Sequence, residues 1–350
     1  MNLAFTEHMP ADEEQKKPLT KKLSASGIFA PIQDSLAELD EFLEGQISQF
    51  SPVTRPLVKY TLSHRGKRLR PALVFFSGMR ADGVAEKNVI TGAAVVELIH
   101  LATLVHDDIL DAATIRHASP TLFAKYGAHT AVLLGDAILA QALQLASAFD
   151  SAELCRAIAV ATRKICDGEI WQTTERGNSE LSLESYFQII QMKTGELFEI
   201  SAFLGATLGG NGAEYGKACA EFGRRIGRAY QIFDDLVDFL GTEDSIGKTL
   251  GTDFASGKYT LPMILFLQKK SPQQRAEISK KIASGLLSIS ELSAEMREAG
   301  TFAESKKFFD EECRAAVAAV APFENFPGTA GLVGVANFVA AQVENFFAAD

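Results

Sequence analysis

Several common structural devices are scarce in this 350-residue chain. It has 4 cysteines, at positions 155, 166, 219 and 313, and none of them forms a Cys-x-x-Cys pair or a zinc-type spacing. This spacing favours reduced, metal-free thiols in the cytoplasm. No apolar run reaches the roughly eighteen uncharged residues of a membrane span, so no integral membrane segment is expected. No cleavable signal is expected ahead of the main body of the chain.

Basic charge is also in deficit. The chain has 34 Lys and Arg against 44 Asp and Glu, a formal net charge of −10 and a pI near 5.2. Such a balance argues against a protein that binds the phosphate backbone of nucleic acid. Any anionic ligand must therefore be met by a local site. Because 47% of the residues are hydrophobic, the chain can bury the core of a globular protein.

Proline is nearly missing from the centre of the chain, where only Pro120 lies between Pro71 and Pro262. This stretch is rich in Ala, Leu, Ile and Glu, so it predicts unusually long helices. Strand signals are weak, because no two alternating β-branched runs are joined by a tight turn. We therefore predict an all-α protein. Residues 1–27 are expected to form a mobile polar tail, and residues 28–350 a single helical domain.

The most informative pattern is Asp-Asp-x-x-Asp, which occurs at Asp107–Asp111 and again at Asp234–Asp238. On a helix turning ~100° per residue, the first and fifth positions lie ~40° apart, so three carboxylates project from one side. Both copies lie in apolar helical runs, where ionised carboxylates are costly unless a cation compensates them. Oxygen-only ligands suit Mg²⁺. Acidic, solvated helix faces are the alternative, and the repeated pattern without interleaved basic residues disfavours it.

Cations are clustered in spite of the acidic balance. Gly66–Pro71 is a short basic turn leading into a helix that starts near Pro71, although a solvated basic surface would look the same. Lys193–Glu196 interrupts a helical run with a Thr-Gly pair, which predicts a kink that frees backbone carbonyls, although an ordinary helix end is the alternative. Lys248 and Lys258 belong to the long loop after the second aspartate pattern.

His100 precedes Asp107 by seven residues, about two helical turns, and lies within ~20° of the same face. From there its imidazole would donate to an anion. A lone histidine on an apolar helix is more often structural, so this residue alone does not decide between the two roles.

These residues resemble the polyprenyl synthetase family of trans-isoprenyl diphosphate synthases, with matches from about Leu36 to Pro262 and weaker ones beyond. The matching motifs are Gly66-Lys67-Arg68-x-Arg70-Pro71, Glu97-x-x-His100, His106-Asp107-Asp108, Gly135-Asp136, Gly168-Glu169-x-x-Gln172, Lys193-Thr194, Gln231 with Asp234-Asp235-x-x-Asp238, Gly247-Lys248, Asp253 and Gly257-Lys258-x-Thr260-Leu261-Pro262. The resemblance implies an all-helical bundle around a deep central cavity, of the isoprenoid synthase type. It also implies a homodimer that joins isopentenyl diphosphate to an allylic diphosphate.

The resemblance assigns roles residue by residue. About three Mg²⁺ ions, for which Mn²⁺ can substitute, would be held on the allylic diphosphate by six aspartates. Those six are Asp107, Asp108, Asp111, Asp234, Asp235 and Asp238. The other residues of the allylic diphosphate site would be Arg116, Lys193, Gln231, Lys248 and Lys258. The phosphates of isopentenyl diphosphate would be bound by Lys67, Arg70 and His100.

One position departs from the family. After the first aspartate pattern the family has two adjacent arginines followed by glycine, whereas this chain has Arg116-His117-Ala118. The second arginine normally grips isopentenyl diphosphate. His117 therefore implies a weaker or pH-dependent grip, or one shared with another cation. The C-terminus, ending in Asp350, also lacks the basic residues that some relatives place over the site.

Product length is expected from helix geometry. Thr103 lies one helical turn, ~5.4 Å, below Asp107, and both Thr103 and Ala102 are small. In short-chain relatives a large aromatic near this level forms the floor of the cavity. Its absence predicts products of about twenty carbons or more, with the floor set deeper by Ile99 and by the helix around 154–165. Close packing of helices is the alternative explanation for the small residues.

The predicted reaction is a head-to-tail (1′-4) condensation of isopentenyl diphosphate with dimethylallyl, geranyl or farnesyl diphosphate. Its product is an all-trans polyprenyl diphosphate, formed by Mg²⁺-assisted ionisation, condensation and proton loss. The residues expected to carry catalysis are Asp107, Asp108, Asp111, Lys193, Thr194, Gln231, Asp234 and Lys248. A terpene cyclase, a non-catalytic or regulatory subunit of a heteromeric synthase, and a helical Mg²⁺-binding scaffold remain as alternatives.

Overall fold

A computed structural model describes residues 25–63, 66–81, 85–116, 119–241 and 251–347. Its α-helices are α1 (Ala25–Phe29), α2 (Gln33–Gln46), α3 (Arg55–Ser63), α4 (Leu69–Ser77), α5 (Lys87–Leu110), α6 (Leu122–Tyr126), α7 (Ala128–Ala146), α8 (Ala152–Thr174), α9 (Leu183–Ile190), α10 (Glu196–Leu208), α11 (Ala213–Leu240), α13 (Thr252–Ala255), α14 (Leu261–Gln268), α15 (Pro272–Ala283), α16 (Ile289–Glu298), α17 (Thr301–Val320) and α18 (Thr329–Phe347). A π-helix covers Gln191–Gly195, and 3₁₀ turns cover Ala30–Ile32, Ile47–Gln49 and Ala321–Phe323. The expected all-α class is confirmed.

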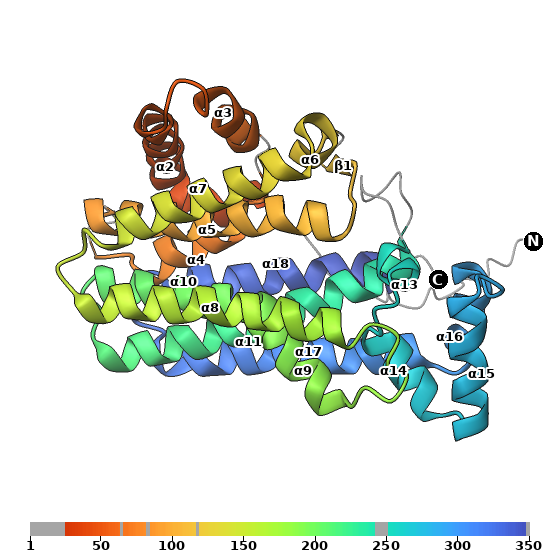
Figure 1. Cartoon of the computed structure of the whole chain (residues 1–350). Helices are drawn as coiled ribbons and strands as arrows, with labels where there is room; N and C mark the ends of the chain where they lie inside the picture. The colour runs from red at the N-terminus through yellow and green to blue at the C-terminus, as the bar shows by residue number, and fades with distance from the viewer. Residues whose placement is uncertain (1–24, 64–65, 82–84, 117–118, 242–250, 348–350) are drawn as a thin grey trace, which may run out of the picture.

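The helix α10 lies at the centre of the bundle. It packs against α4, α5, α8 and α11, which surround it in Figure 1. Nine of its thirteen residues are buried, including Leu197, Phe198 and Leu204, because hydrophobic side chains occupy almost every face of this helix. Helices α5 and α11, which carry the aspartate patterns, thus both pack against this central helix.

Glycines let α11 approach the elements that carry the predicted site. A Cβ atom added at Gly227 would lie 2.7 Å from the Cα of Gly195 in the π-helix. One added at Gly223 would lie 2.3 Å from the carbonyl oxygen of Phe198 on α10. Both distances are below any normal carbon contact, so only glycine permits this backbone spacing.

Two short strands are an addition that the sequence patterns do not predict. β1 (Ile115–Arg116) pairs with β2 (Ser119–Pro120) in antiparallel register, with Arg116 opposite Ser119. The hydroxyl of Thr121 donates to the carbonyl of Ala113 at 2.7 Å and fastens the base of this hairpin. Strands of two residues are too short to show an alternating pattern, and this pair holds Arg116 beside the end of α5.

The described part of the chain starts at Ala25 with helix α1. Helix α4 begins at Leu69, two residues before the start expected near Pro71. The mobile tail predicted for residues 1–27 lies almost entirely outside the described residues.

Two helices, α5 and α7, are long and apolar enough to cross a membrane by length and composition alone. In α5, 72% of an apolar 18-residue stretch is buried inside the protein, against 33% in α7. Helix α5 therefore has the burial of a core helix, and its apolar length is explained by packing against α4, α7 and α10.

Candidate active site

The first aspartate triad lies at the C-terminal end of α5. Asp108 is buried, and its Oδ1 accepts a hydrogen bond of 2.8 Å from Nε of Arg116 on β1. Asp107 is partly buried and feels the charges of Lys193 and Glu169 from the opposite wall. Asp111 is the residue just after the helix and is exposed. The carboxylate of Asp108 is thus held by Arg116, while Asp107 lies toward Glu169 and Lys193.

The second triad lies in the last two turns of α11 and is more deeply buried. Asp235 accepts hydrogen bonds from the hydroxyl of Tyr186 at 2.6 Å and from Nε2 of Gln231 at 2.9 Å. Oδ1 of Asp238 accepts a bond of 2.9 Å from the backbone N–H of Gly251. Asp234 is partly buried on the same helix. Protein donors therefore orient Asp235 and Asp238 before any ligand binds.

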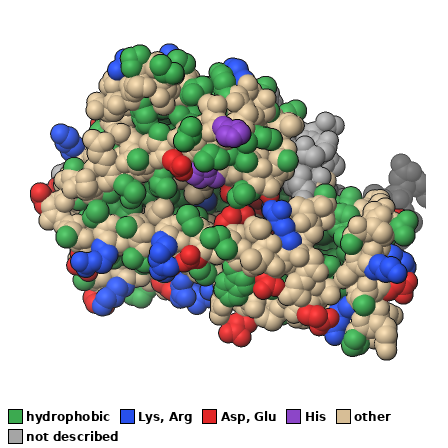
Figure 2. Space-filling model, viewed as in Figure 1, with side chains coloured by type: hydrophobic (Ala, Val, Ile, Leu, Met, Phe, Trp, Pro, Cys, Tyr) green, Lys and Arg blue, Asp and Glu red, His purple; other side chains and the backbone are tan. Residues whose placement is uncertain are grey.

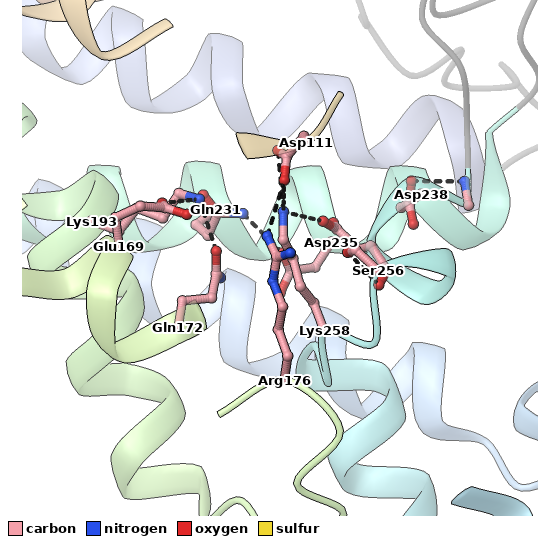
Figure 3. Close-up of polar contacts among 12 residues, drawn as sticks. Asp111, Glu169, Gln172, Arg176, Lys193, Gln231, Asp235, Asp238, Ser256 and Lys258 are labelled. Atoms are coloured by element: carbon pink, nitrogen blue, oxygen red, sulfur yellow. Dashed lines mark hydrogen bonds and ion pairs between the residues drawn. The ribbon is translucent and has the colours of Figure 1, made fainter. Parts of the chain in front are cut away.

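Two cations converge on Asp111 (Figure 3). Nζ of Lys258 lies 3.0 Å from its Oδ1, and Nη2 of Arg176 lies 3.3 Å from the same oxygen. Lys258 also forms an ion pair of 3.2 Å with Asp253 on α13. The family resemblance assigns Lys258 to the allylic diphosphate site, and the structure places it against the first triad although it follows the second in sequence.

The interruption predicted at Lys193–Glu196 is confirmed as the π-helix between α9 and α10. Within it, Nζ of Lys193 donates to Oε1 of Gln172 at 2.8 Å and forms an ion pair with Glu169, both on α8. The hydroxyl of Thr194 donates to Oε1 of Gln231 on α11 at 2.7 Å. A widened turn thus directs two consecutive polar side chains toward different helices, as π-bulges at functional sites do.

The basic turn before α4 is held by α5. Arg68, in a left-handed conformation with φ of 52°, pairs with the buried Glu97 and, at 3.0 Å, with Asp40 of α2. Nη1 of Arg70 lies 3.1 Å from Nε2 of His100, one turn after Glu97. Arg68 and Arg70 are therefore bound by Glu97 and His100, which lie three residues apart on one face of α5.

Arg70 also connects the turn to both triads. Its guanidinium stacks on the ring of Phe198 at 4.4 Å, a cation–π contact. Burial lowers the pKa of Arg70, and the negative charges of Glu97, Asp107 and Asp234 oppose that shift. A single cation thus senses carboxylates of α5 and of α11, so the structure brings the two triads to one site.

The ionised forms of two carboxyl groups in this site, those of Asp107 and Asp235, are disfavoured by their surroundings. Burial raises the pKa of Asp107 to about 6, with Glu169 and Asp111 adding to the rise against Lys193 and Arg116. Burial likewise raises the pKa of Asp235 to about 7, aided by the charge of Asp253. Both triads also lie at helix C-termini, where the backbone dipole is negative and disfavours carboxylates. The site is therefore deficient in positive charge.

These donors fit a hard divalent cation. Among the described residues, no three Asp, Glu, His or Cys side chains are close enough to form a metal cluster by themselves. Mg²⁺ is normally bound by one or two carboxylates together with waters and substrate phosphates, rather than by a complete protein cage. The carboxylates of the two triads are oxygen ligands of this kind.

The residues predicted to set product length lie below the first triad on α5. Ile99 is 2% exposed and Ala102 is 1% exposed, so both are packed in the core. Thr103 is partly exposed, and its hydroxyl donates to the carbonyl of His100 at 2.8 Å. Of the three, Thr103 offers the side chain with accessible surface.

Some predicted residues cannot be placed, and some placed residues were not predicted. Lys248 and His117 lie outside the described residues. Lys67 lies beside the ring of Phe338, 5.9 Å from its centroid. Arg176 and Tyr186 belong to the site but were missed. Arg176 is next to Gly177, as Lys258 is next to Gly257, and this is the sequence signal that could have indicated Arg176.

Figure 2 shows acidic and basic side chains meeting at the seam between the upper and lower helices of this face. An all-helical bundle with two aspartate triads and several convergent cations at one end defines an enzyme that handles diphosphates through divalent ions. The polyprenyl synthetase family model matches residues 51–298. The chain belongs to this family.

Individual relatives agree with that assignment. The all-trans-nonaprenyl-diphosphate synthase (geranyl-diphosphate specific) of Rhodobacter capsulatus is 34% identical over 258 residues, covering 74% of this chain and 79% of that protein. The crystal structure of a decaprenyl diphosphate synthase from Rhodobacter capsulatus covers 91% of this chain and 99% of its own, with 27% identity and a TM-score of 0.84.

A third comparison is with a structure that contains ligands. The polyprenyl synthase from Caulobacter crescentus CB15, complexed with calcium and isoprenyl diphosphate, has 26% identity and a TM-score of 0.81. It covers 91% of this chain, which in turn covers 98% of it. The predictions of family and fold, and of a trans-prenyltransferase that makes polyprenyl diphosphates, are confirmed.

Proposed function

We propose that this enzyme elongates an allylic diphosphate with isopentenyl diphosphate at the site between α5 and α11, giving a long all-trans product. The observation that carries the proposal is the pair of aspartate triads, in which burial raises the pKa of Asp107 and of Asp235 and Arg70 feels the charge of both triads. We propose that the six aspartates of the two triads hold about three Mg²⁺ ions. Arg116, Tyr186 and the backbone N–H of Gly251 orient Asp108, Asp235 and Asp238. Asp111 would exchange its ion pairs with Lys258 and Arg176 for a cation.

When bound, Mg²⁺ supplies the positive charge that lets diphosphate leave. Lys193 and Lys258 would move from their carboxylate partners to the diphosphate oxygens, and Arg116 would remain at Asp108 beside them. The C–O bond of the allylic substrate breaks, and its electron pair departs with the diphosphate. Gln231 and Thr194, oriented by their mutual hydrogen bond, would direct oxygen dipoles at the developing allylic cation. No side-chain nucleophile is required.

The second substrate would bind at the turn before α4. Arg70, His100 and Lys67 would bind the phosphates of isopentenyl diphosphate and hold its double bond toward the cation. A carbon–carbon bond forms between C4 of isopentenyl diphosphate and C1 of the allylic group. The bond leaves a cation at C3 of the isopentenyl unit. A proton is then lost from C2 of that unit to the released diphosphate, which forms the double bond of the new allylic chain. Water must be excluded throughout, because it would trap the cation.

We further propose a cytoplasmic homodimer. All four cysteines are free thiols, as expected in a reducing compartment. Several apolar side chains are exposed on α7, including Val132 and Leu133, which is 69% exposed. Hydrophobic side chains also spread over the part of the surface in Figure 2 where α7 and α8 lie. A second copy packed on this face would cover them.

The deciding experiment incubates the enzyme with isopentenyl diphosphate, Mg²⁺ and each allylic primer, and measures the length of the extracted product. Elongation to about C20 or beyond, lost with EDTA, would support the proposal. Asp107→Ala and Asp234→Ala should reduce turnover by orders of magnitude, whereas the control Asp167→Ala on the exposed face of α8 should not. Diphosphate release from primer alone would instead indicate a cyclase, and no turnover a partner subunit.

A further inference from the structure

The contact between Arg176 and Asp111 points to a cation beyond those that the family motifs include. Arg176 follows the last turn of α8, and Lys258 follows α13. Between these elements the backbone N–H of Gly177 donates to the carbonyl of Gly257 at 2.8 Å. Both glycines have positive φ, of 79° and 72°, a conformation that favours glycine. Arg176, just before Gly177, and Lys258, just after Gly257, then both reach the carboxylate of Asp111.

The charges at this point are unevenly matched. Asp111 is approached by two cations, while Lys258 has a second carboxylate in Asp253. Within the described part of the chain, Arg176 forms an ion pair with Asp111. Nε of Arg176 is buried and has no hydrogen-bond partner there. A guanidinium with one weak contact of 3.3 Å and an unused donor has capacity for a further anion.

We propose that Arg176 binds the diphosphate of the allylic substrate, acting with Lys258 as a pair of cations fastened by the Gly177–Gly257 hydrogen bond. This inference rests on the proposed function. A divalent cation at Asp111 would compete with Arg176 for that carboxylate and leave its guanidinium beside the incoming diphosphate. Arginine suits this role because its planar donors can bind two phosphate oxygens at once.

The experiment compares Arg176→Gln, Arg176→Lys and the control Arg163→Gln, which removes an exposed arginine from α8, the helix that precedes Arg176. Isothermal titration calorimetry measures binding of inorganic pyrophosphate with Mg²⁺ present, and of Mg²⁺ alone. We expect Arg176→Gln to weaken pyrophosphate binding about tenfold, Arg176→Lys by less, and Arg163→Gln by under about twofold. The KM of the allylic substrate should rise with it, and that of isopentenyl diphosphate should not.

Unchanged pyrophosphate affinity in Arg176→Gln would overturn the inference. So would tighter binding of Mg²⁺ alone with unchanged pyrophosphate binding, because Arg176 would then serve only to neutralise Asp111. Circular dichroism and thermal unfolding of each variant establish that it is folded before titration. Failure of the wild-type protein to bind Mg²⁺-pyrophosphate or to elongate a primer would contradict the proposed function itself, and is distinct from a null result for Arg176 alone.

Discussion

Tyr186 on α9 donates a hydrogen bond of 2.6 Å to Asp235 on α11, and both side chains are buried. Burial, with the neighbouring charge of Asp235, raises the pKa of the Tyr186 hydroxyl well above its usual value. The hydroxyl therefore stays protonated and remains a donor at any physiological pH. This contact fixes the orientation of an aspartate in the second triad from an element that the sequence motifs do not include.

Replacing Tyr186 by Phe should loosen that aspartate. Asp235 would keep Gln231 as a side-chain donor but lose its shortest hydrogen bond, at a cost of about 1–3 kcal/mol in unfolding free energy. We expect weaker Mg²⁺ binding as well, measured by titration in the presence of pyrophosphate. Tyr259→Phe is the control, because its hydroxyl contacts Ser279 instead. Equal Mg²⁺ affinity in both variants would show that Tyr186 only supports the fold.

The raised pKa values of Asp107 and Asp235 predict how pH and metal act together. With folded pKa values of about 6 and about 7, both groups favour the neutral form in the metal-free protein. Both carboxyls hold their protons more tightly in the folded protein than in the unfolded chain, where an ordinary carboxyl titrates at about pH 4. Their contribution to the free energy of unfolding is therefore full below about pH 4 and is lost as the pH rises through the folded values of about 6 and about 7. A bound cation favours the ionised form.

The increase in melting temperature on adding Mg²⁺ should therefore be larger at pH 8 than at pH 5.5. Differential scanning calorimetry with and without Mg²⁺ across this range measures it. In the double variant Asp107→Asn, Asp235→Asn the pH dependence of the increment should flatten. A wild-type increment that is the same at both pH values would contradict the assignment of these carboxylates to metal binding.

Arg70 should govern affinity for the second substrate. Its guanidinium contacts His100 and stacks on Phe198, and a lysine ammonium cannot reproduce both contacts. We expect Arg70→Lys to raise the KM for isopentenyl diphosphate about tenfold with a small change in that for the allylic primer. Steady-state kinetics with each substrate varied in turn provide the comparison, with the exposed Arg80→Lys as control. An equal rise in both constants would place Arg70 at a shared element instead.

Product length should respond to Thr103 rather than to Ala102. A phenylalanine at position 102 would have to displace core atoms, since Ala102 is 1% exposed, whereas Thr103 is partly accessible. We expect Thr103→Phe to shorten the main product, read by chromatography of the dephosphorylated lipids. Thr91→Phe on the outer part of α5 is the matched control, since its hydroxyl makes the same kind of contact to its own helix. An unchanged product length would locate the lipid tail elsewhere.

What the sequence predicted depended on local spacing. The aspartates follow from positions along single helices, where the 3.6-residue period fixes their direction. The family resemblance supplied Lys193 and Thr194. Arg176 and Tyr186 were missed because their neighbours lie 65 and 49 residues away, so only the packed bundle joins them. The β1–β2 pair was missed because two residues per strand carry no period.

The π-helix at Gln191–Gly195 sets the rotational phase between α9 and α10. A turn of i→i+5 bonds contains one residue more than a regular turn, so α9 and α10 behave as one rod with its halves offset by about 100°. That offset lets Tyr186 point at α11 while Phe198 still fills the centre of the bundle. Deleting Met192 would straighten the rod and swing Tyr186 off its aspartate, without removing any residue that the proposed reaction uses.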